Sequence, residues 1–169
     1  HNILYDIHNL NENYDNLINK YKIHKLNKRD FAFVNNVCLN TMRYYFHTQN
    51  ILNKYIIKKP KLNEKILFCS AITQIVFLEF KDYGVINSTV EISKSLNIYP
   101  GFVNATLKQI SKNKKNLKKT LIHYKDLPDW FIKKTKHLTK FEKNEFLNNF
   151  FIEPDLHLVF KNNKSLFEF

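Results

Sequence analysis

Lysines that follow one another without an acid between them are the first side chains in this sequence that suggest chemistry. From residue 108 to residue 119 the chain carries six lysines and no aspartate or glutamate. Four of them recur at helical spacing, so one helix face would carry Lys108, Lys112, Lys115 and Lys119. Such a row attracts a phosphate backbone by releasing its condensed counterions, which predicts contact with RNA or another nucleic acid.

The net charge of +12 extends this argument to the whole chain, but it has a second explanation. A strongly basic balance favours a polyanionic partner such as nucleic acid. Lysine, asparagine and isoleucine are all abundant, however, and that composition is typical of A/T-rich codons. We therefore keep two explanations open: an RNA-binding face, and a solvated helix face whose lysine excess is mutational.

Only two of the 27 basic side chains are arginines, Arg29 and Arg43. The planar guanidinium of arginine offers a fork of donors that matches phosphate. We add both arginines to the candidate RNA-binding residues and favour Arg43. The alternative for Arg43 is a charge at a helix C-terminus or an ion pair with Glu91.

The cysteines and histidines show no pattern of a catalytic or metal site. Cys38 and Cys69 each lie among apolar helical residues, which favours buried structural thiols over nucleophiles or a disulfide. The seven histidines are scattered, with no H-x-x-x-H or C-x-x-C pair, and two glycines cannot form a phosphate-binding loop. We expect no catalytic residue, metal or cofactor within these residues.

The composition favours an all-α fold. The 169 residues are 44% hydrophobic, enough for a core, while two glycines and four prolines are too few for the turns of a β protein. The most apolar run, residues 66–80, is shorter than the ~20 residues of a membrane span, and Gln74 and Glu79 interrupt it. With no signal peptide evident, we expect a soluble, cytoplasmic protein without a membrane partner.

Periodicity predicts the helices that would position these residues. Residues 62–80 are apolar nearly all round, which is typical of a central helix buried on every side. We expect an earlier helix capped by Asp30, with Arg43 and His47 on its polar face, and a short helix over residues 51–57.

The lysine-rich part follows a predicted turn at residues 82–84 and a helix over residues 85–96. Pro100 is expected to begin the next helix, with Gly101 allowing a neighbouring helix to approach closely. This helix would turn its lysines outward.

The last part of the chain changes character. Pro128 favours a helix start, with Trp130 and Phe131 as the anchor of the last helices onto the bundle. A phenylalanine-rich helix is expected over residues 141–151 and a single strand over residues 156–160.

Two segments resemble the NusB-like fold. Residues 30–43, DFAFVNNVCLNTMR, are similar to its D-R-x-F-x-x-x-L-V-x-G-x-L-R helix, with Asn40 in place of the glycine. Residues 87–108, NSTVEISKSLNIYPGFVNATLK, resemble its V-N-E-x-V-E-x-A-K and F-V-N-A-V-L-R helices, with Lys108 in place of the final arginine. The resemblance implies a NusB-like, RNA-binding helical domain over residues 1–123.

The tail resembles the RsmB (Sun/Fmu) family of small-subunit rRNA cytosine-5 methyltransferases. Residues 127–130, LPDW, are similar to its Y-x-x-P-x-W element, and residues 153–158, EPDLHL, resemble its P-P-L-T-L-R-V-N strand. The resemblance implies that residues 124–169 are linker helices and the start of a methyltransferase region whose catalytic domain is absent. It further implies small-subunit rRNA and that catalytic domain as partners, and S-adenosylmethionine as cofactor of the parent enzyme.

The function implied is that of a non-catalytic RNA-binding domain that helps to position rRNA for such an enzyme. Two alternatives stay open. One is a stand-alone NusB-type transcription antitermination factor that binds RNA together with a ribosomal protein. The other is a protein-interaction helical module whose lysines only increase solubility.

Overall fold

The computed structural model describes residues 1–120 and 122–152, and in these residues every regular element is a helix. The all-α fold is therefore confirmed, whereas the strand expected at residues 156–160 lies outside the described residues. In chain order the elements are α1 (Asn2–Leu10), α2 (Tyr14–Lys20), the 3-10 turn η1 (Ile23–Lys25), α3 (Lys28–Arg43), α4 (Tyr45–Asn53), α5 (Leu62–Ile72), the π-helical turn η2 (Thr73–Phe77), α6 (Asp82–Ser95), α7 (Pro100–Lys118), the 3-10 turn η3 (Tyr124–Asp126), α8 (Asp129–Lys134) and α9 (Lys140–Phe150).

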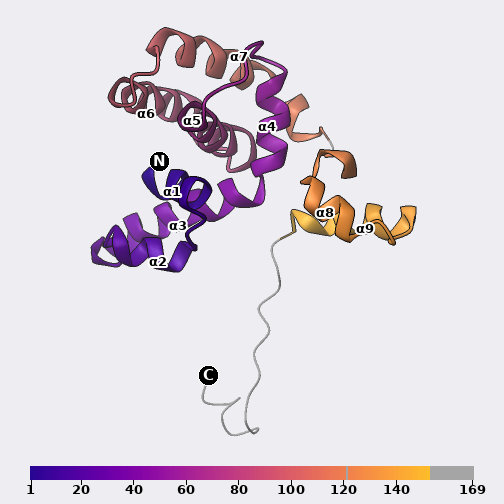
Figure 1. Ribbon diagram of the computed structural model, residues 1–169. Coiled ribbons are helices and arrows are strands. Elements are labelled where there is room, and N and C mark those ends of the chain that lie inside the picture. Colours follow the sequence, from indigo (N-terminus) through magenta and orange to yellow (C-terminus); the bar gives the residue numbers. More distant parts are fainter. Residues whose placement is uncertain (121, 153–169) are drawn as a thin grey trace, which may run out of the picture.

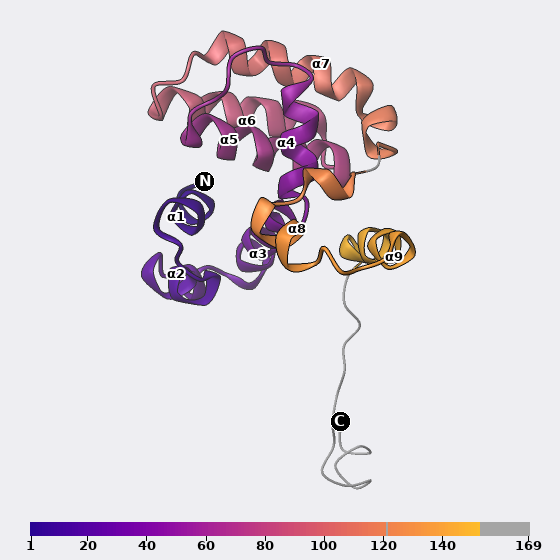
Figure 2. The ribbon, with the colours of Figure 1, turned by 45° about the vertical axis from the view of Figure 1, so that its right-hand side comes forward.

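Helix α5 is the centre of the bundle, as its uniformly apolar sequence predicts. It contacts α1, α3, α4, α6 and α7, and Figures 1 and 2 show α7 on one side of it and α1 to α3 on the other. Ile66, Phe68 and Ile72 of α5 have no exposed surface. Burying each such side chain contributes about 1.5–3 kcal/mol, so this helix supplies much of the stability of the fold.

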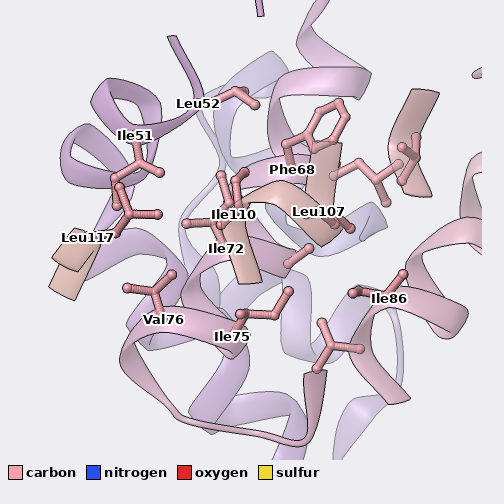
Figure 3. Close-up of a cluster of buried hydrophobic side chains, with 14 of the residues drawn as sticks. Ile51, Leu52, Phe68, Ile72, Ile75, Val76, Ile86, Leu107, Ile110 and Leu117 are labelled. Carbon is pink, nitrogen blue, oxygen red and sulfur yellow. The ribbon is translucent and has the colours of Figure 1, made fainter. Parts of the chain in front are cut away.

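Two apolar clusters meet at α5. The larger one joins α5 to α4, the π turn, α6 and α7, and Figure 3 shows its side chains pointing toward one another from these elements. The smaller one joins Ile66 and Cys69 of α5 to side chains of α1, α2 and α3 and to Tyr45 of α4. Helix α5, with α4 beside it, therefore holds together two groups of helices.

Helix starts and ends follow local chemistry, with three corrections to the sequence analysis. The cap of α3 is Asn27, whose side-chain oxygen accepts from the Asp30 backbone N at 2.9 Å, so Asp30 lies inside the helix and is not its cap. Helix α4 begins at Tyr45 and ends at Asn53, so the prediction of a helix over residues 51–57 was wrong. Residues 82–84 form the first turn of α6 and not a separate turn.

The expected long helix over residues 62–80 changes type at Thr73. Five residues there form a π turn, in which the Leu78 backbone N donates to the Thr73 carbonyl at 3.0 Å. Glu79 then takes a left-handed backbone with φ of 54°, and the Phe80 N closes the end by donating to the Gln74 carbonyl at 2.9 Å. Turns of this kind occur often at functional sites.

Helix α7 begins at Pro100, as predicted, and continues without a break to Lys118. Its Gly101 has a different role from the one expected. A Cβ at Gly101 would lie 2.9 Å from Cε1 of Tyr99, so the missing side chain makes room for the Tyr99 ring and not for a neighbouring helix.

Helices α8 and α9 join the bundle through aromatic rings. Phe131 of α8 meets Phe146 of α9 at 4.9 Å between ring centroids, and Phe151 at the end of α9 stacks on Tyr44 at 5.3 Å. Trp130 is 62% exposed and touches Phe131 edge-on, so it is not part of the anchor that the sequence predicted. Among the ring contacts, those of Phe151 with Tyr44 and His47 reach the bundle.

If α5 holds the two groups together, Ile72→Ala should lower the free energy of unfolding by about 2–5 kcal/mol, because it leaves a cavity in the core. Urea denaturation followed by circular dichroism measures the change. The matched control is Ile57→Ala, the same substitution at a fully exposed position, which should change stability by less than about 0.5 kcal/mol. Equal effects of the two substitutions would contradict the central role of α5.

Candidate nucleic-acid interface

The lysine row, defined as Lys108, Lys112, Lys115 and Lys119, lies along the outer face of α7 and its C-terminal cap. Val103, Leu107 and Ile110 on the inner face are completely buried. Because this inner face is fixed against the core, the row is held at the surface, and all four lysines are exposed. None of the four forms an ion pair within residues 1–120 and 122–152.

The other two lysines of α7 are engaged in ion pairs. Lys114 Nζ lies 2.7 Å from Asp82 Oδ1, and Lys118 Nζ lies 2.7 Å from Glu79 Oε1. In the sequence all six form a run without acids. The two pairs have no local signal, because Glu79 follows the π turn and Asp82 begins α6, both distant in the sequence.

The two acids respond differently to their surroundings. Burial of Asp82 opposes its ionisation, but hydrogen bonds from Lys114 and Ser111 outweigh this and lower its pKa. The Lys118 hydrogen bond lowers the pKa of Glu79, which is itself exposed. Both carboxylates are thus ionised and neutralise only Lys114 and Lys118, so the lysine row keeps its charge.

The two arginines lie on α3, away from the row. Arg29 is exposed in the first turn, and Arg43 is half-buried in the last turn, where its Nη1 donates to Asn40 Oδ1 at 2.8 Å. Glu91, the ion-pair partner considered for Arg43, pairs with Lys94 at 2.6 Å. Since α3 and α7 lie on opposite sides of α5, the six candidate residues do not form one face (Figure 2).

A cavity of about 740 Å³ lies at the C-terminal end of α7, and we call it the aromatic cavity. It is formed by the start of α4, the π turn, the end of α7 with the segment after it, and α9. The residues that line it include Tyr44, His47, Phe77, Lys118, Asn148 and Phe151. No local pattern in the sequence predicts this cavity, because these side chains come from four separate segments.

Three rings form a stack in this cavity. The Tyr44 ring is parallel to Phe77 at 4.1 Å and to Phe151 at 5.3 Å between centroids, each with an interplanar angle of 4°. His47 is tilted against both phenylalanines, at 5.0 and 5.6 Å. All three stacked rings are only half-buried. The cavity wall thus combines half-buried aromatic rings with a lysine, Lys118.

His47 is the unusual polar residue of the cavity wall. The sequence analysis placed it on the exposed polar face of the preceding helix, which was wrong because α3 ends at Arg43 and α4 starts a new register at Tyr45. It is 5% exposed, and neither ring nitrogen has a hydrogen-bond partner among the described residues. Burial lowers its pKa. The Thr120 backbone opposes this shift, and the charge of Lys54 adds to it.

Both cysteines are free and buried, as predicted. Burial raises the pKa of the Cys38 thiol, and it raises that of Cys69 to about 11. Neither thiol is poised to act as a nucleophile, because nucleophilic cysteines need partial exposure and a lowered pKa.

Within the described residues, no group of three or more His, Cys, Asp or Glu side chains could hold a metal ion. None of the helices in residues 1–120 and 122–152 has the length and apolar character to cross a membrane.

The comparison with protein families matches residues 1–112 to the family described as the NusB family. Neither the curated proteins nor the solved structures gave a match. The matched residues run from α1 to Lys112 of α7. They include half of the lysine row, whereas the α9 side of the aromatic cavity lies beyond them.

The buried His47 predicts a pH dependence of stability. Because its pKa is lowered in the folded state, the unfolded state binds the proton more readily, and stability should fall as the pH drops below about 6.5. In His47→Phe, the loss of unfolding free energy between about pH 7 and about pH 5 should be smaller than in the wild type by roughly 1 kcal/mol.

Urea denaturation at a series of pH values makes this measurement. His24→Phe removes an exposed imidazole and is the matched control, which should keep the pH dependence of the wild type. Identical pH profiles for His47→Phe and the wild type would show that this imidazole is not held neutral by burial.

Proposed function

The chain belongs to the NusB family, and on this basis we propose that it is an RNA-binding helical protein that holds RNA phosphates with the lysine row of α7. The observation that carries the proposal is the exposed row of four lysines without carboxylate partners in the described residues. A row of this kind neutralises phosphates and releases their counterions, which favours binding at low salt.

As the more detailed function we propose the RNA-binding part of an RsmB-like rRNA (cytosine-5) methyltransferase, which helps to position rRNA. Two features support this. The LPDW element at residues 127–130 resembles that family, and α8 and α9 follow the matched region and pack onto the bundle. Since Cys38 and Cys69 are buried, the methyl transfer from S-adenosylmethionine would be carried out by the enzyme's own catalytic domain.

A NusB-type antitermination factor is the second candidate, and it is equally compatible with the family match. It is supported by the extent of that match, which covers α1 to α6 and most of α7 and so includes both apolar clusters except for Leu117. Such a factor would bind its RNA together with a ribosomal protein. The two candidates therefore differ in their expected RNA target and in their need for a protein partner.

Titration of the chain with small-subunit rRNA helices and with an unrelated duplex, at two salt concentrations, tests these proposals. Preferential and salt-sensitive binding to the rRNA helices supports the methyltransferase context. Tight binding that requires a ribosomal protein supports the antitermination factor. If no RNA binds at low salt, the RNA-binding proposal fails and a protein-interaction module takes its place.

The double variant Lys112→Glu, Lys115→Glu should weaken RNA binding at least tenfold, because it removes two phosphate contacts and adds repulsion. The slope of log affinity against log salt concentration should become less steep by about 1 for each lysine replaced. Fluorescence anisotropy with labelled RNA at several salt concentrations measures both quantities.

The double variant Lys22→Glu, Lys25→Glu provides the control. It makes the same change in net charge at exposed positions between α2 and α3, on the far side of α5 from α7 (Figure 1). It should keep most of the wild-type affinity and slope. Equal losses in the two double variants would show that net charge and not the lysine row controls binding.

A further inference from the structure

We propose that the aromatic cavity accepts an unpaired nucleobase of single-stranded RNA whose backbone lies along the C-terminal lysines of α7. This inference rests on the proposed RNA binding and adds the kind of RNA that is bound. It concerns the cavity lined by Tyr44, His47, Phe77, Lys118, Asn148 and Phe151.

The size and rings of the cavity suit a base. Its volume of about 740 Å³ falls in the range of ligand pockets, roughly 300–1,000 Å³, and leaves room for a nucleoside. Tyr44, Phe77 and Phe151 stack in parallel and keep part of their surface exposed. Proteins that bind single strands commonly stack bases on such rings beside a positively charged groove.

The lysines of α7 lead directly to this cavity. Lys118 lines it and also lines the neighbouring hollow, together with Lys114, Lys115 and Lys119. The pair between Lys118 and Glu79 is exposed on both sides, so a phosphate can compete for this lysine. A strand on the lysine row therefore brings its next nucleotide to the mouth of the cavity.

His47 distinguishes a base from an apolar side chain as the occupant. It is nine-tenths buried in the cavity wall, and its two ring nitrogens have no hydrogen-bond partner among the described residues. A buried polar group without a partner is unfavourable. Both nitrogens are themselves buried, so the ring must turn to bring one of them to the cavity. The edge of a base carries donors and acceptors that satisfy the imidazole in that orientation, whereas an apolar peptide side chain leaves it unsatisfied.

A comparison of two probes of equal charge tests the inference: single-stranded oligouridylate and a ribose-phosphate strand of the same length without bases. Wild-type protein should bind oligouridylate about 5- to 150-fold more tightly, since stacking of one base contributes that much. Asn148→Trp places a large ring at the mouth of the cavity without removing any of its aromatic contacts. In this variant the ratio of the two affinities should fall towards one.

Asn149→Trp is the matched control, because it makes the same substitution at the next position of α9, which does not line the cavity. It should keep the wild-type ratio. Tyr44→Leu removes the central ring and should lower the ratio as Asn148→Trp does, with circular dichroism to verify its fold.

The outcomes separate this inference from the proposed function. In one outcome, binding depends on the lysine row, but the ratio of the two affinities is the same in Asn148→Trp, Asn149→Trp and the wild type. This result overturns the base site alone and leaves the cavity to a protein segment. Failure of the wild type to bind either strand at low salt overturns the base site. The proposed function fails with it only if the small-subunit rRNA helices do not bind at low salt either. A ratio that falls in Asn148→Trp and not in Asn149→Trp supports the base site.

Discussion

The burial of α5 on every side is the constraint on which the rest of the structure depends. A helix that is apolar all round is stable in water only when other helices cover each of its faces. Five helices do so here, and α7 is one of them. Once the inner face of α7 is fixed by Val103, Leu107 and Ile110, the outward position of the lysine row follows from helical geometry alone.

The π turn at the end of α5 determines what surrounds the C-terminal end of α7. The wider turn shifts the register of the residues that follow, and the left-handed backbone of Glu79 ends the helix. Phe77 then stacks on Tyr44, and Glu79 pairs with Lys118. The π turn therefore contributes a wall of the aromatic cavity, and the residues that end the helix after it contribute the acid that pairs with Lys118.

Sequence reasoning succeeded where the signal was local. The central helix was recognised from its apolar run, and the start of α7 from Pro100. It failed where partners are distant in the chain: Lys114 and Lys118 pair with acids 32 and 39 residues away, and no spacing rule finds such pairs. The position of His47 was missed because the break between α3 and α4 at Tyr44 carries neither glycine nor proline.

The structure also bears on whether codon bias explains the lysines. Mutational bias can supply lysines, but it does not decide which of them are neutralised. Here Asp82 and Glu79 neutralise Lys114 and Lys118. The lysine row keeps like charges at i, i+3 and i+4 spacing, and each such pair destabilises a helix by about 0.2–0.5 kcal/mol. A phosphate backbone relieves this repulsion when it binds. The row therefore favours a polyanionic partner whatever the mutational origin of its lysines.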